Sequence, residues 1–346
     1  TKKTTPNLYN LRKHSIDFSN HYSIYTGGGS TFNSEFAVNT GFTTPISYIE
    51  NVYSFSKNTF PYTMARLFKE QNYSVNAFHM NKGEFYSRDI NYKSWGYDNY
   101  YGLQDIQKYN DERYVLDREL TFYNKIFKQQ GNFVNYIITY SPHTPFTTEK
   151  EVGKILAEEK YGKGNVPKLS EEDCAKMAAS ETDNMVGLLI QALKDNGLYD
   201  NTVIVAYADH YLYTLDDKSI LDKYKETSNN LINHTPFFIW SSDLGQLTSI
   251  SKVNMQMDIL PTVLNLFGID YNSNNYIGHD ILSNDFKGYA FFSDYSWYDG
   301  KVYVENQQIT NGKKMSKNKL DSMNNLISDV IKKNDLTLKY DYFKSK

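Results

Sequence analysis

The run Thr26-Gly27-Gly28-Gly29-Ser30-Thr31-Phe32-Asn33-Ser34-Glu35-Phe36 is the part of this 346-residue chain from which the fold can be inferred. Three consecutive glycines let the backbone take positive φ and approach a ligand closely. Asn33, Ser34 and Glu35 favour the first turn of a helix, so Thr31 is expected at the junction between loop and helix. Free amides and the helix dipole favour an anion there, and a metal that lowered its pKa would make the threonine hydroxyl a nucleophile. A flexible glycine loop with a capping hydroxyl explains the same residues.

A second stretch, far downstream, complements this loop. An apolar, β-branched run over residues 202–208 ends in Asp209 and His210. A buried parallel strand delivers side chains in this way to the carboxyl edge of its sheet, where α/β proteins place their sites. Carboxylate oxygen and imidazole nitrogen together suit Mn²⁺ or Zn²⁺ better than Ca²⁺. The alternative is that the pair only caps the end of a strand.

Two further histidines follow predicted strands. Residues 74–78 form a predicted strand that ends at His79, and residues 132–140 form another that is followed by His143. Each of these histidines, taken alone, is explained equally well as a hydrogen-bonded structural residue. Together with His210, however, three histidines leave three strand ends, which is the pattern of a site at the edge of a sheet.

Composition narrows the class of protein. The net charge of −3 gives no electrostatic case for nucleic-acid binding. The single cysteine, Cys174, rules out an internal disulfide. The 31 tyrosines suit a groove for carbohydrate or lipid headgroups, although a genome rich in A and T explains them as well. Because the sequence holds no run of about 18 apolar residues, we expect no membrane span in it.

A series of short motifs, taken in order, resembles those of one known family. They are residues 5–11 (TPNLYNL), 29–36 (GSTFNSEF), 85–89 (FYSRD), 94–98 (SWGYD), 141–146 (SPHTPF), 209–210 (DH), 236–239 (PFFI) and 257–262 (MDILPT). Over nearly its whole length the chain resembles the extracellular catalytic domain of the lipoteichoic acid synthase family. These proteins are metal-dependent phosphoglycerol transferases on the sulfatase/alkaline-phosphatase fold.

The resemblance implies an α/β fold, namely a sulfatase-like three-layer sandwich with a central, mostly parallel sheet. A smaller C-terminal subdomain of antiparallel sheet plus helix is expected over residues 286–346, after a catalytic domain over residues 1–285. Apolar periodicity predicts helices over residues 5–16, 62–71, 111–129, 171–196, 253–267 and 320–333. It predicts strands over residues 18–25, 74–78, 132–140, 202–208, 234–240, 289–293 and 301–304. The charged residues 147–170 are expected to form a surface loop or lid, and the polar residues 214–233 to cross the mouth of the site.

The resemblance also implies roles for individual residues. Thr31 matches the family's nucleophile, which is also a metal ligand, and Asp209 and His210 match two further metal ligands. His79 and Arg88 match residues that hold the phosphoglycerol group. The start of one helix and the ends of two strands would then contribute residues to one site.

Arg88 suits this role because a guanidinium binds phosphate oxygens through a planar fork of donors. The alternative for Arg88 is a surface ion pair with Asp89 or Glu84. Tyr86 lies where the family often has a tryptophan, so an altered aromatic wall for the glycerol is expected there.

Two more histidines are assigned to the substrate. His143 is expected to hydrogen-bond the transferred phosphate or the leaving oxygen. His234 lies where many family members have arginine, and contact with substrate and a structural role are equally supported for it.

The implied reaction moves glycerophosphate from phosphatidylglycerol to a growing polyglycerolphosphate chain through a covalent intermediate on Thr31. One divalent metal is implied, with Mn²⁺ as first choice and Mg²⁺ or Zn²⁺ as alternatives. A phosphoethanolamine transferase, a phosphodiesterase and a non-catalytic glycerophosphate-binding domain remain as alternatives. A sulfatase is disfavoured because the C/S-x-P-x-R context that its nucleophile needs does not surround Thr31.

Family members carry one more apolar strand upstream of the position of Pro6, and this strand ends in a glutamate that completes the metal site. The present sequence begins after that strand, so we expect it to be an ectodomain from a longer protein. By resemblance the protein lies at the extracellular face of the cell membrane of a Gram-positive bacterium. It is held there by an N-terminal region outside this sequence, or is released as a soluble domain.

Overall fold

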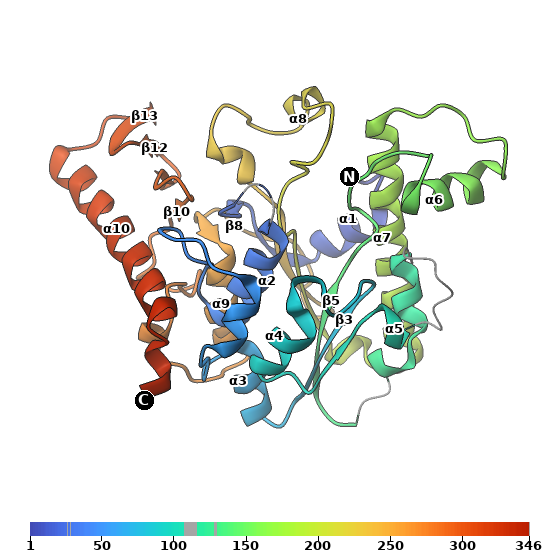
Figure 1. Cartoon of the computed structure of the whole chain (residues 1–346), viewed down its shortest axis with the longest axis horizontal. Coiled ribbons are helices and arrows are strands. Elements are labelled where there is room, and N and C mark those ends of the chain that lie inside the picture. Colours follow the sequence, from blue (N-terminus) through green and yellow to red (C-terminus); the bar gives the residue numbers. More distant parts are fainter. Residues whose placement is uncertain (26, 28, 107–115, 128–129, 346) are drawn as a thin grey trace.

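The protein is a mixed α/β structure, seen here in a computed structural model that describes residues 1–25, 27, 29–106, 116–127 and 130–345 (Figure 1). Two sheets form its centre. One is parallel throughout, with the strand order β4 (Asn99–Tyr101), β3 (Ser74–His79) and β5 (Phe133–Ile138). The other has the order β6 (Val203–Tyr207), β7 (Phe237–Ser241), β1 (Ser15–Phe18) and β8 (Thr248–Ile250). In that sheet β7 is antiparallel to both β6 and β1, whereas β1 and β8 are parallel.

The two central sheets approach each other along β5 and β6. Among the described strands, β5 pairs only with β3 and β6 only with β7. The hydroxyl groups of Tyr136 on β5 and Tyr207 on β6 hydrogen-bond to each other. The described contact between these two strands is therefore made by side chains, whereas the strands within each sheet are joined by backbone hydrogen bonds.

Alternating side chains of the central strands enter two cores, which produces the layered architecture. On β7, Phe237 and Ile239 belong to one buried cluster, whereas Phe238 and Trp240 belong to another. This alternation follows from the two-residue period of a strand. The first core is covered by α2 (Ser30–Thr40), α3 (Met64–Glu70) and α9 (Ile259–Leu266), and the second by α1 (Pro6–Arg12) and α7 (Glu171–Asp195). The expected three-layer α/β fold is confirmed.

The C-terminal part forms a small antiparallel sheet with a long helix, as expected. The sheet consists of β10 (Ala290–Phe291), β11 (Trp297–Tyr298), β12 (Val302–Glu305) and β13 (Gln308–Gly312), in that order. Helix α10 (Lys317–Lys339) packs Ile327 and Ile331 into the same buried cluster as Val302 and Val304. In Figure 1 this helix runs along the left side of the molecule.

The remaining elements are short. The other α-helices are α4 (Arg88–Ser94), α5 (Leu103–Ile106), α6 (Glu151–Tyr161) and α8 (Ser219–Asp222). The 3-10 helices are η1 (Val52–Lys57), η2 (Phe85–Ser87), η3 (Asp117–Phe122), η4 (Asn124–Ile126), η5 (Tyr199–Asn201), η6 (Asn230–Asn233), η7 (Gln256–Asp258), η8 (Ser273–Asn275) and η9 (Tyr342–Ser345). Strand β2 (His21–Tyr22) pairs in parallel with β9 (Asn254–Met255).

Most predicted elements are present, and those over residues 62–71, 74–78, 132–140, 171–196 and 320–333 correspond to α3, β3, β5, α7 and α10. The predicted helix over residues 5–16 is too long, because Ser15 pairs with Trp240 as the first residue of β1. The predicted strand over residues 18–25 is replaced by the end of β1 and by β2. The predicted helix over residues 253–267 begins only at Ile259, two residues before Pro261.

Two predictions in the middle of the chain are wrong. Of the helix predicted over residues 111–129, residues 111–115 and 128–129 lie outside the described part, and residues 116–127 contain η3 and η4 instead of an α-helix. The charged segment 147–170 is not only a loop, since it contains α6. Val152 and Leu156, four residues apart, bury one face of that helix, and the charged residues elsewhere in the helix obscured this period.

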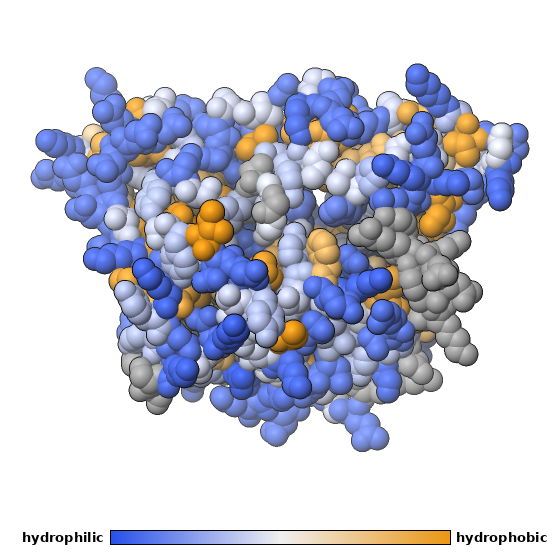
Figure 2. Space-filling view, in the orientation of Figure 1, coloured by the Kyte–Doolittle hydropathy of each residue, from blue (hydrophilic) through white to orange (hydrophobic). Residues whose placement is uncertain are grey.

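The described surface is mainly hydrophilic. On the face shown in Figure 2, the described apolar residues lie in small separate groups. Of the described helices, none combines the length and the apolar composition that crossing a membrane requires. Cys174 lies on α7, is buried in a small apolar cluster, and carries a free thiol.

Candidate active site

Thr31 lies in the first turn of α2, as predicted. Gly29 caps this helix with φ 90°, a conformation that favours glycine, and its carbonyl accepts the Asn33 amide at 2.9 Å. The Ser30 hydroxyl donates to the Gly27 carbonyl at 2.7 Å and so fixes the described part of the loop. Thr26 and Gly28 of the predicted glycine loop lie outside the described residues. All residues of α2 except Thr31 are buried, and Thr31 is half-buried near the start of the helix.

The strand end that carries Asp209 is attached to this helix. The Asp209 carbonyl accepts the Ser34 hydroxyl at 2.6 Å and the Gln256 side-chain amide at 2.8 Å. Ser34 lies one turn after Ser30, so the same helix that presents Thr31 also holds the end of β6. The side chain of Asp209 remains 38% exposed, which leaves its carboxylate available to a ligand.

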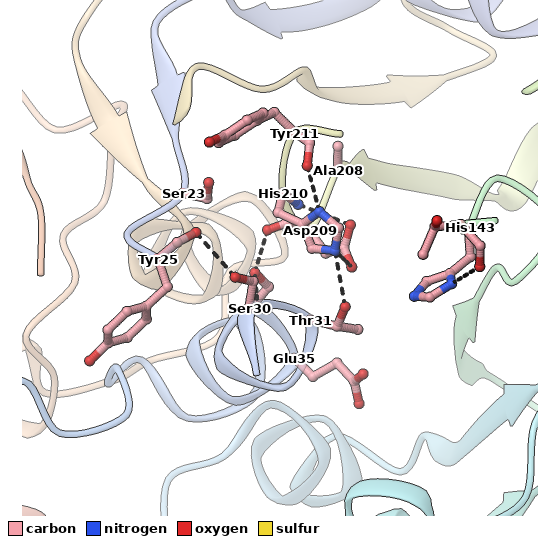
Figure 3. Close-up of polar contacts among 12 residues, drawn as sticks. Ser23, Tyr25, Ser30, Thr31, Glu35, His143, Ala208, Asp209, His210 and Tyr211 are labelled. Atoms are coloured by element: carbon pink, nitrogen blue, oxygen red, sulfur yellow. Dashed lines mark hydrogen bonds and ion pairs between the residues drawn. The ribbon is translucent and has the colours of Figure 1, made fainter. Parts of the chain in front are cut away.

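His210 faces Thr31 through one ring nitrogen. Its Nδ1 lies 2.7 Å from the Tyr211 carbonyl, and because a carbonyl only accepts, Nδ1 is the donor. In the neutral ring Nε2 therefore carries a lone pair. This atom lies 3.2 Å from Thr31 Oγ1 and 3.3 Å from Asp209 Oδ2. Figure 3 shows the imidazole of His210 between the Tyr211 carbonyl and the Thr31 hydroxyl, with the Asp209 carboxylate near the Thr31 side.

The side chains of Asp209, His210 and Thr31 have the chemistry of metal ligands, and two of the distances among them can be compared with those of a metal site. Two ligands bonded tetrahedrally at roughly 2.1 Å lie about 3.4 Å apart, close to the separations just given. A ligating histidine typically gives its other nitrogen to a carbonyl or carboxylate, as His210 does. Within the described ranges, no group of three His, Cys, Asp or Glu residues is placed to hold a metal. Asp209, His210 and the Thr31 hydroxyl fit Mn²⁺, Zn²⁺ or Mg²⁺ by their chemistry, but they form only a partial ligand set.

Arg88 forms a buried ion pair with a carboxylate from α2. Its Nη2 and Nε atoms donate to Glu35 Oε1 at 2.6 Å and to Glu35 Oε2 at 3.0 Å. The hydroxyl of Tyr92 also donates to Glu35 Oε2, at 2.9 Å. Burial alone would lower the pKa of Arg88, but the Glu35 carboxylate outweighs it and the net shift is upward. The surface ion pair with Asp89 or Glu84 that the sequence allowed is not formed.

The third nitrogen of Arg88 is buried without a hydrogen-bond partner. This atom is Nη1, and the guanidinium to which it belongs lies over the ring of Tyr86, with 5.0 Å between the Arg88 guanidinium carbon and the ring centroid. Tyr86 and Ser87 both take left-handed backbone conformations, with φ 58° and 47°. Residues other than glycine rarely adopt these, and each costs on the order of 1 kcal/mol or more. A strained turn thus holds an aromatic ring over the arginine.

His79 lies behind this arginine and is 3% exposed. Its Nδ1 donates to the Ile138 carbonyl at 2.9 Å, so Nε2 carries the lone pair. Burial, followed by the positive charge of Arg88, lowers the pKa of His79 well below its usual value. His79 is therefore neutral at pH 7 and adds no positive charge to the site.

His143 lies on the same side of the molecule but at the surface. Its Nδ1 donates to the Thr144 carbonyl at 2.7 Å, and its ring stacks on Tyr140 at 5.9 Å. Asp117 fixes the preceding turn by accepting the Tyr140 amide at 2.7 Å and the Ser141 amide at 3.0 Å. Figure 3 shows His143 set apart from Thr31.

The structure does not bring His234 into contact with Thr31, Asp209 or His210 in the described part of the chain. Its Nε2 donates to the Ser19 carbonyl at 2.8 Å, and its ring lies 5.3 Å from that of Tyr22. Because the nitrogen that could contact substrate is bonded to the backbone, these contacts favour the structural alternative. The substrate role of His234 stays a prediction.

Four residues at the site were not singled out by sequence reasoning. Glu35 and Tyr92 hold Arg88, and Ser34 and Gln256 hold the Asp209 carbonyl. For Glu35 a signal was present, because it lies four residues after Thr31 and so on the same face of the helix. The sequence pattern alone assigns Glu35 only to the first turn of a helix. No comparable signal marks Gln256.

Comparisons with known proteins place the chain among sulfatase-like proteins. Residues 1–269 match the family described as Sulfatase. The chain is 29% identical to the lipoteichoic acid synthase of Staphylococcus saprophyticus, over 98% of this chain and 55% of that protein. It is 28% identical to the lipoteichoic acid synthase of Staphylococcus aureus, over 89% of this chain and 50% of that protein. The chain thus spans about half the length of these curated relatives.

Solved structures show the same fold. The lipoteichoic acid synthase LtaP from Listeria monocytogenes superposes with a TM-score of 0.78 at 23% identity, covering 99% of this chain and 86% of that one. A protein of the alkaline phosphatase superfamily from Vibrio parahaemolyticus superposes with a TM-score of 0.69 at 19% identity, covering 99% and 82%. The two central sheets and the helices on either side are therefore an arrangement shared with this superfamily.

Proposed function

Because the chain belongs to the Sulfatase family, we propose that it is a phosphotransferase that moves glycerophosphate from phosphatidylglycerol to a polyglycerolphosphate chain. One observation carries the proposal: the Thr31 hydroxyl lies at the N-terminus of a buried helix, 3.2 Å from the lone-pair nitrogen of His210. Similarity to curated lipoteichoic acid synthases supports this substrate class. The catalytic unit is taken as residues 1–285, with residues 286–346 as a subdomain.

In the first half of the reaction, Thr31 Oγ attacks the phosphorus of the lipid headgroup. The Thr31 hydroxyl loses its proton, a bond forms between Oγ and phosphorus while the bond to the diacylglycerol oxygen breaks, and that oxygen takes up the proton released by Thr31. The amides of the first turn of α2 point toward the phosphate, because such amides have no acceptor within the helix. A divalent cation held by Asp209, His210 and Thr31 would favour the deprotonated form of the attacking hydroxyl.

Arg88, His79 and His143 are the proposed contacts of the phosphoglycerol group. Arg88 offers its unpaired Nη1 to a phosphate oxygen once the Tyr86 ring moves aside. His79 and His143 each present a bare Nε2, which accepts hydrogen bonds from glycerol hydroxyls or takes a proton from an attacking alcohol. Tyr86 would then form the wall of the glycerol site. His234 is retained only as a distant candidate for substrate contact.

The second half of the reaction reverses the first with a different alcohol. A terminal glycerol hydroxyl of the polymer attacks the phosphorus, its proton passes to a base such as His143, and the bond to Thr31 Oγ breaks. Water in place of this alcohol would make the protein a phosphodiesterase. The exposed carboxylate of Asp209 and the exposed ring of His143 are open to water and favour hydrolysis as the second candidate.

The site of action follows from the donor. Phosphatidylglycerol is a membrane lipid, so we place the domain at the outer surface of the cell membrane, where its substrate headgroups are. Mn²⁺ is the proposed metal, with Mg²⁺ and Zn²⁺ as alternatives.

Intact mass spectrometry tests the proposal. The protein is incubated with Mn²⁺ and phosphatidylglycerol, quenched, and digested to locate any adduct. We expect a gain of one glycerophosphate on the peptide that contains Thr31. The variant Thr31→Ser should still form the adduct, whereas Thr31→Ala should form none and should melt at the wild-type temperature. An adduct on another residue, or wild-type turnover in Thr31→Ala, would overturn the covalent mechanism.

A further inference from the structure

The ion pair between Glu35 and Arg88 is almost fully sealed from solvent. The two side chains are 3% and 2% exposed, and three donor–acceptor distances between them lie at or below 3.1 Å. Glu35 projects from α2 one turn after Thr31, and Arg88 opens α4. One carboxylate therefore connects the helix of the proposed nucleophile with the proposed phosphate ligand.

This pairing changes what Arg88 can offer an anion. An unpaired guanidinium presents a fork of two parallel donors and a full positive charge. Here Glu35 occupies Nε and Nη2, so only Nη1 remains without a partner. The negative charge of Glu35 also offsets the positive charge at a distance of a few ångströms, in a buried setting where charges act strongly.

The neighbouring groups add no positive charge in compensation. His79 is neutral at pH 7 because its pKa is lowered by burial and by Arg88. Tyr92, which donates to the same carboxylate, is uncharged, and Asp209 contributes a further carboxylate on the other side of the site. The described protein groups around Arg88 thus form a donor site of low net charge.

We propose that Glu35 determines specificity by tuning this site to singly charged phosphodiesters and against doubly charged phosphomonoesters. The inference rests on the proposed function, because it assumes that a phosphate ester meets Arg88. A diester carries one negative charge and needs one strong donor on its free oxygens. A monoester carries about two negative charges at pH 8 and would be favoured by the uncompensated guanidinium.

A purely structural role for Glu35 makes a different prediction. If the pair only joined α2 to α4, removing the carboxylate would lower stability and reduce binding of both ester classes alike. The ratio between the two classes is therefore the informative measurement, since a loss of folded protein does not change it.

The experiment compares Glu35→Gln with the wild type at pH 8, with and without Mn²⁺. The amide is nearly isosteric and still accepts hydrogen bonds, so the charge is the main change. Calorimetry gives the Kd of ethyl phosphate and of diethyl phosphate, and kcat/KM is measured for p-nitrophenyl phosphate and bis(p-nitrophenyl) phosphate. We expect the monoester-to-diester ratio to rise by about tenfold or more in Glu35→Gln. An unchanged ratio would overturn the proposal.

Two controls separate charge from packing. Tyr92→Phe removes a hydrogen bond to Glu35 but no charge, and it should leave the ratio unchanged. Asp17→Asn removes the carboxylate of another paired arginine, Arg12, at 2.7 Å, and should also leave it unchanged. A tenfold rise in either variant would contradict the assignment to Glu35.

If Glu35→Gln does not fold, the affinities of the wild type for the two esters test the proposal. Ethyl phosphate should then bind no more tightly than diethyl phosphate, and tenfold tighter binding of the monoester would reject the proposal. A failure of this proposal can be distinguished from a failure of the proposed function. If the proposed function is wrong, the wild type forms no adduct on Thr31, although its ester preference can still be measured by binding.

Discussion

Which ring nitrogen a histidine gives to the backbone decides what the other nitrogen can do. His79, His143 and His210 each donate Nδ1–H to a carbonyl, so Nε2 remains as an acceptor or ligand in all three. His234 instead gives Nε2 to a carbonyl. His143 and His210 use the carbonyl of the residue that follows each of them, whereas His79, the last residue of β3, uses the carbonyl of Ile138 on the neighbouring strand β5. Their chemistry is therefore set by hydrogen bonds to the backbone.

Metal binding is the property of single residues that is simplest to test. His210→Ala removes one of the two strongly coordinating side chains, and we expect Mn²⁺ affinity to fall by at least about tenfold. The content of bound Mn²⁺ after dialysis, measured by elemental mass spectrometry, gives the result. His143→Ala is the matched control, because its exposed imidazole lies apart from Thr31 (Figure 3). Equal metal content in His210→Ala and the wild type would exclude His210 as a ligand.

At the scale of elements, the short turn η2 and helix α4 carry strain next to the site. Tyr86 and Ser87 are consecutive residues with positive φ, and the turn leads directly into the residue that pairs with Glu35. Backbone strain of this kind persists only where the surroundings enforce it. Here the enforcing contacts are the buried ion pair on one side and the Tyr86 ring over Arg88 on the other. The strain in this turn is therefore maintained by contacts of Arg88 itself.

Replacing Ser87 by glycine should relieve part of this strain. Glycine adopts φ near 47° without steric cost, so we expect Ser87→Gly to raise the free energy of unfolding by up to about 1 kcal/mol. Lys93→Gly, an exposed position inside α4, should lower it by about 1 kcal/mol. Urea denaturation measures both changes. Destabilisation of similar size in the two variants would show that the turn holds no such strain.

The sequence predicted the larger elements better than the contacts between them. The positions of the strand ends at His79 and Asp209 followed from apolar runs. The buried parallel strand expected before Asp209 was wrong, because β6 is only partly buried and pairs antiparallel with β7, its one described partner. Helix α6 was missed because charged residues filled its outer face. The pairing of Glu35 with Arg88 could not be predicted, since the two are 53 residues apart and each is typical of an exposed position. Tertiary packing, which no local period encodes, decides such contacts.

At the scale of the whole molecule, buried histidines make stability depend on pH. Burial lowers the pKa of His21 from its usual 6.5 to about 4, and that of His79 in the same direction. The unfolded chain therefore binds protons below pH 6.5 that the folded chain does not. The contribution of these neutral histidines to the free energy of unfolding is fully present above pH 6.5 and is lost as the pH falls toward 4. For His21 alone this contribution is about 3 kcal/mol.

Thermal unfolding between pH 7.5 and 4.5 checks this dependence. We expect the wild type to lose stability steadily below pH 6.5, and His21→Gln to show a shallower decline, because the amide does not titrate. His14→Gln serves as the control, since His14 is exposed and its replacement should leave the slope unchanged. A wild-type curve that is flat over this range would contradict the assigned shifts.

The position of β6 has a consequence for amide hydrogen exchange. Among the described strands, β6 is paired on one side only, by β7, whereas β1 is paired on both sides, by β7 and β8. Alternate amides of β6 point away from β7 and lack the protection that a second ladder would give. Deuterium should therefore enter half of β6 quickly while β1 stays protected. The strand that leads to Asp209 and His210 would then be labelled more readily than β1.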